Sequence, residues 1–311
     1  MRISPEHPPL RGRDDAKEAP DALRIHQSAT AYDAQHPQAP GKVLIGFACD
    51  AGVIRNLGRS GAKAGPNAIR GQLGGLALHS EVALYDAGDI VCEGDKLEEA
   101  QAELGELVGE VLSGGHLPIV VGGGHEVAFG TFTGLWRFLG QSDHRSDRLA
   151  IINLDAHFDL RASPVPSSGT PFAQIAKVLG QAGKSFNYYC LGVSRSSNTR
   201  ALFRIADELA VHYAYDYELQ ETPHRLIDEI ITSHDSIYLS IDLDVLPAST
   251  MPAVSAPAAF GVPLKVVEEI STLLLASEKI VAIDIAEYSP PFDIDLRGAR
   301  VAARLIHSLL D

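Results

Sequence analysis

The amino-acid sequence predicts an α/β protein with a mainly parallel β-sheet covered by helices on both faces. Short, nearly continuous apolar runs recur along the chain, which is typical of strands buried on both faces. Longer segments with apolar residues at helical spacing separate these runs. Because parallel strands need long crossover connections, this alternation favours a parallel sheet over an antiparallel one.

Eight strands are predicted from their apolar runs. They are Val43–Phe47, Val82–Tyr85, Leu117–Val121, Leu149–Leu154, Tyr188–Val193, Val211–Ala214, Ile237–Ile241 and Ile280–Ile285. Five helices are predicted between and after them. They are Leu97–Leu112, Val127–Leu139, Pro223–Thr232, Pro263–Leu275 and Arg297–Leu310. The first helix places Leu104, Leu107 and Val111 on one stripe, and Pro263 suits the first turn of its helix.

The domain organisation is predicted from a change of pattern near residue 40. Residues 1–40 are rich in proline, histidine, aspartate and arginine, and we expect an irregular arm packed on the domain, with room for one short helix over 20–28. Residues 41–311 contain no break in composition and are expected to form a single domain.

Composition excludes several classes of function. The chain of 311 residues carries 26 lysines and arginines against 40 acidic residues, a net charge of −14, so it is not expected to bind nucleic acid. It has no apolar run long enough to cross a membrane and no secretory signal, so we expect a cytoplasmic protein. Its three cysteines form no CxxC pair, which argues against a thiolate zinc site.

Polar residues follow four of the predicted strands, where a parallel sheet gathers its functional loops. These segments are Gly122–Glu126, Asp155–Asp159, Asp242–Asp244 and Ala286–Tyr288. In an extended chain Asp155, His157 and Asp159 would share a face, as would Asp242 and Asp244. Four aspartates in one cleft repel one another unless cations neutralise them. With two imidazoles added, the donor set suits two Mn²⁺ ions, with Fe²⁺, Co²⁺ or Zn²⁺ as alternatives.

Each of these segments has a simpler interpretation when taken alone. Asp155–Asp159 could be a loop of capping residues with a surface histidine, and Gly122–Glu126 could be a tight turn. The latter lacks the spacing of a dinucleotide-binding or P-loop motif, so nucleotide binding is poorly supported. The combination of several ligand-type clusters, each directly after a strand, favours a metal site.

Five segments resemble the ureohydrolase family of arginases, agmatinases and formimidoylglutamases. They are GAKAGPNAIR (61–70), GGGHE (122–126), NLDAHFDLR (153–161), SIDLDVLP (240–247) and DIAEYSP (284–290). The resemblance implies an arginase-like three-layer αβα fold, a catalytic domain over 41–311 and two Mn²⁺ ions per chain. It also implies a homo-oligomer that acts on a small-molecule substrate.

The resemblance assigns roles by position. Six residues would bind metal: His125 and Asp159 one ion, His157 and Asp244 the other, with Asp155 and Asp242 bridging both. Glu287 would hold the cationic C–N group of the substrate. In the family, a hydroxide that bridges the metals attacks the carbon of a guanidinium or amidine group, and an amine is expelled.

The formimidoylglutamase branch is the best match. Arginases and agmatinases carry a proton-shuttle histidine where this chain has Phe172, whereas SSGTPF (167–172) and GVSRSSNT (192–199) resemble formimidoylglutamases. These enzymes hydrolyse N-formimidoyl-L-glutamate to L-glutamate and formamide in histidine degradation. Arg161 is the first candidate for binding a substrate carboxylate. Further candidates are Ser168, Thr170, Arg195 and Asn198.

Two other functions stay open on sequence alone. The first is an amidinohydrolase that releases urea from another guanidino acid, against which Phe172 argues. The second is a non-catalytic, metal-binding family member, against which the complete set of six ligands and Glu287 argues.

Overall fold

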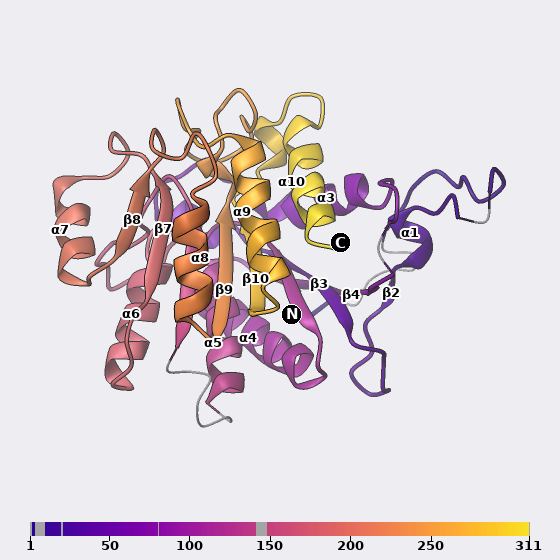
Figure 1. Ribbon diagram of the computed structural model, residues 1–311, viewed down its shortest axis with the longest axis horizontal. Coiled ribbons are helices and arrows are strands. Elements are labelled where there is room, and N and C mark those ends of the chain that lie inside the picture. Colours follow the sequence, from indigo (N-terminus) through magenta and orange to yellow (C-terminus); the bar gives the residue numbers. More distant parts are fainter. Residues whose placement is uncertain (1, 4–9, 20, 80, 141–147, 311) are drawn as a thin grey trace.

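The computed structural model describes residues 2–3, 10–19, 21–79, 81–140 and 148–310 (Figure 1). Within these residues, ten strands form one sheet in the order β1-β4-β3-β5-β10-β9-β6-β7-β8, with β2 beside β4. The strands are β1 Arg2–Ile3, β2 Thr30–Ala31, β3 Gly41–Ala48, β4 Ala83–Val91, β5 Leu117–Gly122, β6 Leu149–Leu154, β7 Tyr188–Val193, β8 His212–Tyr215, β9 Ser236–Asp242 and β10 Ile280–Ala286. All described pairs are parallel except β1 with β4.

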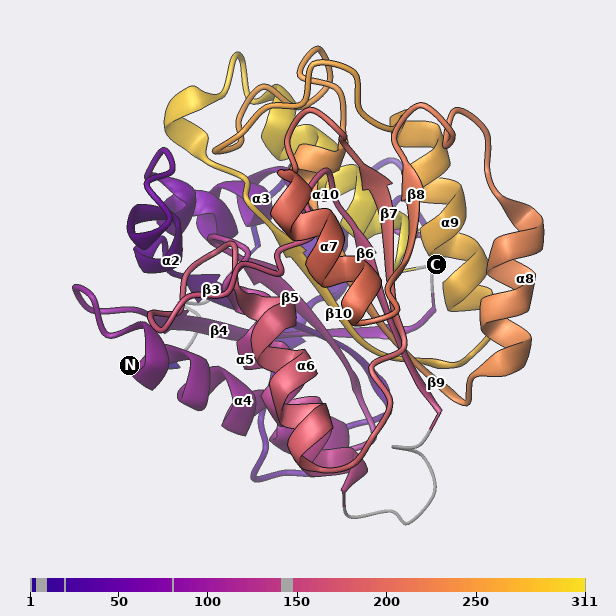
Figure 2. The same cartoon turned by 90° about the vertical axis from the view of Figure 1, so that its left-hand side faces the viewer.

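Helices cover both faces of this sheet (Figure 2). They are α1 Ile25–Ser28, α2 Ala51–Arg55, α3 Gly65–Leu73, α4 Leu97–Ser113, α5 Val127–Leu139, α6 Pro171–Gln181, α7 Arg200–Glu208, α8 His224–Ser233, α9 Leu264–Ala276 and α10 Arg297–Ser308. Helices α3, α8, α9 and α10 share one buried cluster with the sheet, and α4, α5, α6 and α7 share the other. The predicted three-layer αβα fold with a mainly parallel sheet is therefore confirmed.

The strands separate two cores because their side chains alternate between the faces. In β5, Ile119 and Val121 join the cluster under α3 and α10, whereas Val120 joins the cluster under α4 and α5. Burial on both faces explains why these strands are continuously apolar rather than alternating.

Most predicted elements lie where the sequence pattern placed them. Strands β6 and β7 and helix α5 have the predicted bounds. Strand β4 begins one residue later than predicted and runs on to Val91, because its polar residues Asp86 and Asp89 face the arginine of α3. Helices α2, α3, α6 and α7 were not predicted, because they are short or begin near glycine and proline.

Part of the N-terminal segment 1–40 adds two short strands to the sheet that residues 41–311 form. Strand β2 pairs in parallel with β4, and β1 pairs antiparallel with it. The side chain of Arg24 forms an ion pair with Asp15 and donates to the carbonyl of Gly75. Residues 1, 4–9 and 20 of the predicted arm lie outside the described residues.

A buried ion pair joins α3 to β4. Arg70 donates Nε to Asp86 Oδ2 at 2.8 Å and Nη2 to Asp86 Oδ1 at 3.0 Å, and Asp86 is fully buried. Arg70→Met should lower the free energy of unfolding by about 3–5 kcal/mol, because it leaves a buried carboxylate unpaired. Urea denaturation measures this loss. The double variant Arg70→Met/Asp86→Leu should recover much of the loss, and a single-variant loss below about 1 kcal/mol would contradict the burial argument.

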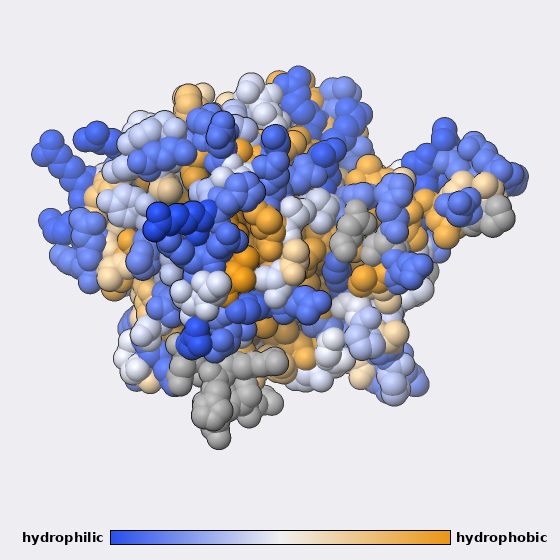
Figure 3. Space-filling view, viewed as in Figure 1, coloured by the Kyte–Doolittle hydropathy of each residue, from blue (hydrophilic) through white to orange (hydrophobic). Residues whose placement is uncertain are grey.

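The outer faces of the helices are largely polar. The space-filling view shows polar residues over most of the face that carries α8, α9 and α10, with smaller apolar areas between them (Figure 3). Among the described residues, no helix is both long and apolar enough to cross a membrane.

Candidate metal centre and active site

Four neighbouring strands bring the candidate residues together. Strands β5, β10, β9 and β6 are consecutive in the sheet and run parallel, so their carboxyl ends meet at one edge. His125 follows β5, Glu287 follows β10, Asp242 ends β9 and Asp155 follows β6. Residues more than 160 positions apart in the chain therefore converge at the centre of the sheet.

The loops that carry the ligands are not extended, and this part of the prediction is wrong. The backbone N–H of His157 donates to Asp155 Oδ1 at 2.6 Å, and Asp159 has φ of 49°, in the left-handed region. Likewise, Asp244 lies in a 3₁₀ turn, and its N–H donates to Asp242 Oδ1 at 2.8 Å. In both loops an aspartate carboxylate accepts from the backbone N–H two residues later. These turns, and not the two-residue repeat of a strand, bring the ligand side chains together.

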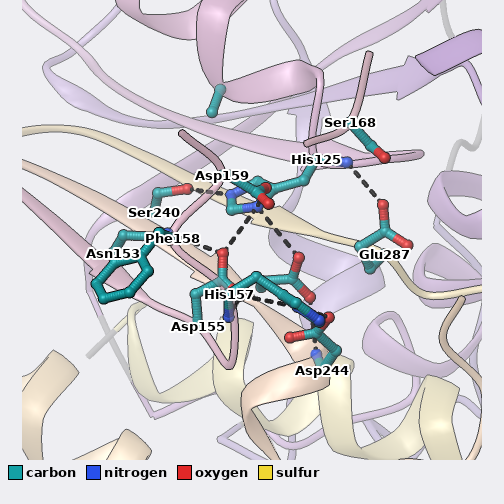
Figure 4. A network of polar contacts seen from close by, with 12 residues as sticks. His125, Asn153, Asp155, His157, Phe158, Asp159, Ser168, Ser240, Asp244 and Glu287 are labelled. Atoms are coloured by element: carbon teal, nitrogen blue, oxygen red, sulfur yellow. Dashed lines mark hydrogen bonds and ion pairs between the residues drawn. The ribbon is translucent and has the colours of Figure 1, made fainter. Parts of the chain in front are cut away.

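Two groups of potential metal ligands result (Figure 4). In the first group, His125 Nδ1 lies 2.9 Å from Asp159 Oδ2, 3.1 Å from Asp242 Oδ2 and 3.2 Å from Asp155 Oδ2. In the second group, His157 Nδ1 lies 2.9 Å from Asp244 Oδ2 and 3.6 Å from Asp155 Oδ1. All six residues proposed as ligands therefore lie in the two groups, and Asp155 belongs to both.

The hydrogen bonds of His125 indicate that a cation belongs in the first group. Ser240 donates its hydroxyl to Asp284 Oδ1 at 2.6 Å, so Ser240 Oγ is left to accept from His125 Nε2 at 2.8 Å. In the neutral imidazole with its proton on Nε2, Nδ1 carries a lone pair. It makes no hydrogen bond of its own although three carboxylate oxygens surround it. Burial lowers the pKa of His125, but Asp242, Asp155 and Asp159 together raise it well above its ordinary value, so the site stabilises positive charge at Nδ1. The oxygen-rich donor set around Nδ1 fits a divalent metal in that place.

Repulsion among the carboxylates supports the same conclusion. Burial and the nearby Asp155 raise the pKa of Asp159 to about 6. Burial, Asp244 and Asp155 also raise the pKa of Asp242. Divalent cations would relieve this repulsion, because they favour the ionised form of each carboxylate.

The groups that orient the ligands were missed in the sequence. Asp284, fully buried in β10, accepts from the hydroxyls of Ser240 and Tyr238. Asn153 donates from Nδ2 to Asp155 Oδ2 at 2.8 Å. Asn153 and Ser240 stand inside strands two positions before a ligand, and Asp284 stands three positions before Glu287. Only the packed sheet reveals their contacts.

Removing the orienting hydroxyl should weaken metal binding. Ser240→Ala leaves His125 Nε2 without its acceptor, so affinity for Mn²⁺ should fall about 10–100-fold, as measured by calorimetric titration of the metal-free protein. Ser271→Ala is the matched control, because Ser271 is also a fully buried serine but donates to Val267 O within α9. Equal affinities of the two variants would contradict the role given to Ser240.

A cavity of about 290 Å³ opens beside the ligand groups. Glu287 lines it, and its Oε1 accepts from the backbone N–H of His125 at 2.9 Å. Its φ of 73° lies in the left-handed region, which turns the chain sharply at the end of β10. Burial and the nearby Glu126 raise the pKa of Glu287 to about 8, so the site favours a cationic group next to this carboxylate.

The predicted substrate-binding residues fall into two sets. Arg161 and Ser168 line this cavity, and so does Asn198. The Asn198 amide, however, donates to the carbonyls of Ala156 and Ser194 and accepts from the Phe158 N–H, so it holds the ligand loop in place. Thr170 and Arg195 do not line this cavity.

Thr170 and Arg195 have other surroundings. Thr170 is buried, and its hydroxyl accepts from the Ser167 N–H within the loop before α6. Arg195 lines a separate surface hollow together with Phe203 and Tyr215.

Two buried residues lie behind the ligands. Phe172 packs edge-on against the ring of His125, with centroids 5.5 Å apart, and stacks on Tyr188. Glu126 accepts the N–H of Gly52 at 2.8 Å and so ties α2 to the loop of His125. In the same loop, a Cβ at Gly123 would lie 1.5 Å from the carbonyl oxygen of Cys49, so only glycine fits there.

Comparison with known proteins places this geometry in context. A sequence model of the Arginase family matches residues 41–311. Formimidoylglutamase of Cupriavidus pinatubonensis is 51% identical over 318 residues, which cover 100% of both chains. Formimidoylglutamase of Paraburkholderia xenovorans is 49% identical, over 96% of this chain and 97% of that protein. The solved structure of Trypanosoma cruzi formiminoglutamase with Mn2+2 matches with a TM-score of 0.80 at 27% identity, covering 93% of this chain and 98% of that one.

Proposed function

The chain belongs to the arginase family, and from this premise we propose that it is a formimidoylglutamase. It hydrolyses N-formimidoyl-L-glutamate to L-glutamate and formamide. The observation that carries the proposal is the position of His125 Nδ1 within 3.2 Å of three carboxylate oxygens, at a cavity that Glu287 also lines. Full-length identity of about half to curated formimidoylglutamases supports the choice of substrate.

We propose that the six ligands hold two Mn²⁺ ions. His125, Asp155, Asp159 and Asp242 would hold one ion, and Asp155, His157 and Asp244 would hold the other. When bound, such ions supply Lewis acidity and lower the pKa of water, which makes a nucleophile available at neutral pH. The oxygen-rich donor set with two imidazoles favours Mn²⁺ over ions that prefer sulfur.

Glu287 is proposed to bind and orient the formimidoyl group. The protonated form of this group is a cation, and the buried carboxylate of Glu287 is the acidic group on the cavity wall that is not assigned to a metal. Its hydrogen bond from the His125 N–H fixes it relative to the metal ligands. The substrate carbon would therefore be held beside the nucleophile, and water adds across the C–N bond to release formamide and the amino group of glutamate.

Phe172 favours this substrate over guanidino acids. At this position the arginases and agmatinases that the sequence resembles carry a proton-shuttle histidine, and a phenyl ring can move no proton. Phe172 is fully buried and packs against the ring of His125, so this position contributes apolar packing and no proton donor.

A substrate panel tests the proposal. The Mn²⁺-loaded protein should have a kcat/KM for N-formimidoyl-L-glutamate at least about a hundredfold above the values for arginine and 4-guanidinobutyrate. The comparison uses initial rates of amine release from each compound. A preference for either guanidino acid would contradict the substrate and leave a urea-releasing amidinohydrolase as the alternative.

We also propose a homo-oligomer in the cytoplasm, which rests on the resemblance to a family whose members often form trimers or hexamers. Light scattering coupled to size-exclusion chromatography measures the molar mass directly. A mass equal to that of one chain would contradict the oligomer.

A further inference from the structure

We infer that Arg59 binds one of the two carboxylates of the substrate, with Arg161 binding the other. This inference rests on the proposed function, because it concerns how the same cavity selects a dicarboxylate. Arg59 follows α2 and Arg161 follows β6, so two separate loops each bring one arginine to the cavity. Among the described residues that line the cavity, these are the side chains with a permanent positive charge.

The chemistry of the substrate calls for two such cations. N-formimidoyl-L-glutamate carries an α-carboxylate and a side-chain carboxylate besides its cationic formimidoyl group. Two divalent ions would neutralise the four aspartates of the metal centre, but the carboxylate of Glu287 would still repel both carboxylates of the substrate. An arginine guanidinium offers two parallel N–H donors to a carboxylate, which gives geometric selection as well as attraction.

Arg59 is held rigidly at the cavity wall. Its Nε donates to the carbonyl of Ser255 at 3.0 Å, its Nη2 donates to the carbonyl of Val254, and its own N–H donates to Ser255 Oγ at 2.9 Å. The guanidinium also lies 4.0 Å above the ring of Phe292. Within the described part of the chain, Nη1 has no acceptor, so its two N–H groups are free to meet a ligand. Because the side chain is already ordered, binding costs little further conformational entropy.

The nearby Arg55 shows the opposite situation. Its guanidinium is paired with Asp95 at 2.7 Å and with Glu98 at 2.8 Å, and it does not line the cavity. The side chain of Arg161, by contrast, has no acceptor among the described residues. Among the described residues, neither Arg59 nor Arg161 forms an ion pair with a carboxylate, and both line the cavity beside the metal centre. Both guanidiniums are therefore placed to bind carboxylates of a substrate in this cavity.

Substrates that each lack one carboxylate test the inference. They are N-formimidoyl-4-aminobutyrate, without the α-carboxylate, and N-formimidoyl-L-2-aminobutyrate, without the side-chain carboxylate. Arg59→Met should lower kcat/KM for the dicarboxylate about 10–100-fold, the cost of losing a charged hydrogen bond. For the analogue that keeps the carboxylate bound by Arg59, kcat/KM should fall by the same factor. For the analogue that lacks this carboxylate, kcat/KM should change by less than about threefold. Arg161→Met should show the same selectivity with the analogues exchanged.

A matched control separates this effect from general damage. Arg148 also donates Nε and Nη2 to a backbone carbonyl, that of Ser233, but it lies at the opposite edge of the sheet, before β6. Arg148→Met should leave all three values unchanged. Arg59→Lys keeps the charge, so the preference for the dicarboxylate should return in part.

Two outcomes would overturn the inference. One is an equal loss with all three substrates in Arg59→Met, and the other is a lysine variant as unselective as the methionine variant. Failure of the proposed function is a different result, because the unsubstituted protein would then turn over none of the three compounds.

Discussion

Asp242→Asn is expected to lower the turnover of N-formimidoyl-L-glutamate by at least about a thousandfold, together with the metal content. The substitution keeps the size of the side chain but removes one negative charge and one oxygen donor. Asp242 Oδ2 lies 3.1 Å from His125 Nδ1, at the centre of the first ligand group. The loss of ~4 kcal/mol of transition-state stabilisation that such a change implies corresponds to about three orders of magnitude in rate.

Two measurements on the same preparation test this expectation, namely bound manganese by mass spectrometry and initial rates with excess Mn²⁺. Asp216→Asn is the matched control. Asp216 is also buried, also follows a parallel strand, and accepts the N–H of Tyr217 at 2.8 Å, but it does not line the cavity. Full metal content and near-normal turnover in Asp242→Asn would remove Asp242 from the metal centre.

Glu287→Gln is expected to lower kcat/KM on the order of 100–1000-fold while the metal content stays close to normal. The amide can still accept from the His125 N–H, which Glu287 Oε1 meets at 2.9 Å, so the loop should keep its position. What it loses is the negative charge opposite the formimidoyl cation, and unpairing a buried charge costs about 2–5 kcal/mol. The effect should therefore fall on catalysis and not on assembly of the metal centre.

Steady-state kinetics and metal analysis separate these two possibilities. Asp242→Asn serves as the contrast, because it should lose metal and activity together. Loss of metal in Glu287→Gln would assign Glu287 to the metal centre, and an unchanged kcat/KM would remove it from the substrate site.

The fold was predictable where local pattern and burial agree. Strand β6 has six apolar or buried residues in a row between polar loops, and α5 has a long apolar face, so both were predicted with the observed bounds. Helix α7 is amphipathic and buries Leu202 and Ala206, but its nine residues give the helical pattern few turns over which to repeat, so it was not predicted. Strands β1 and β2 have two residues each, and their pairing with β4 depends on tertiary contacts.

The site was predictable in composition but not in geometry. The ligand types and their positions after strands were visible, because parallel strands bring their carboxyl ends to one edge. The conformation of Asp155–Asp159 was not, because a backbone N–H to carboxylate bond and a left-handed residue set it. Arg59, Ser240 and Asp284 gave no local signal, since their roles come from contacts with residues distant in sequence.

The most direct test of the central claim is the identity of the products. Metal-free protein is loaded with Mn²⁺ and given N-formimidoyl-L-glutamate in water enriched in ¹⁸O, and the products are quantified by mass spectrometry. We expect one L-glutamate and one formamide per substrate consumed, with the label in formamide because water adds to the formimidoyl carbon, and no release in the presence of a chelator. Release of ammonia with N-formyl-L-glutamate, or equal turnover by the chelated protein, would contradict the account.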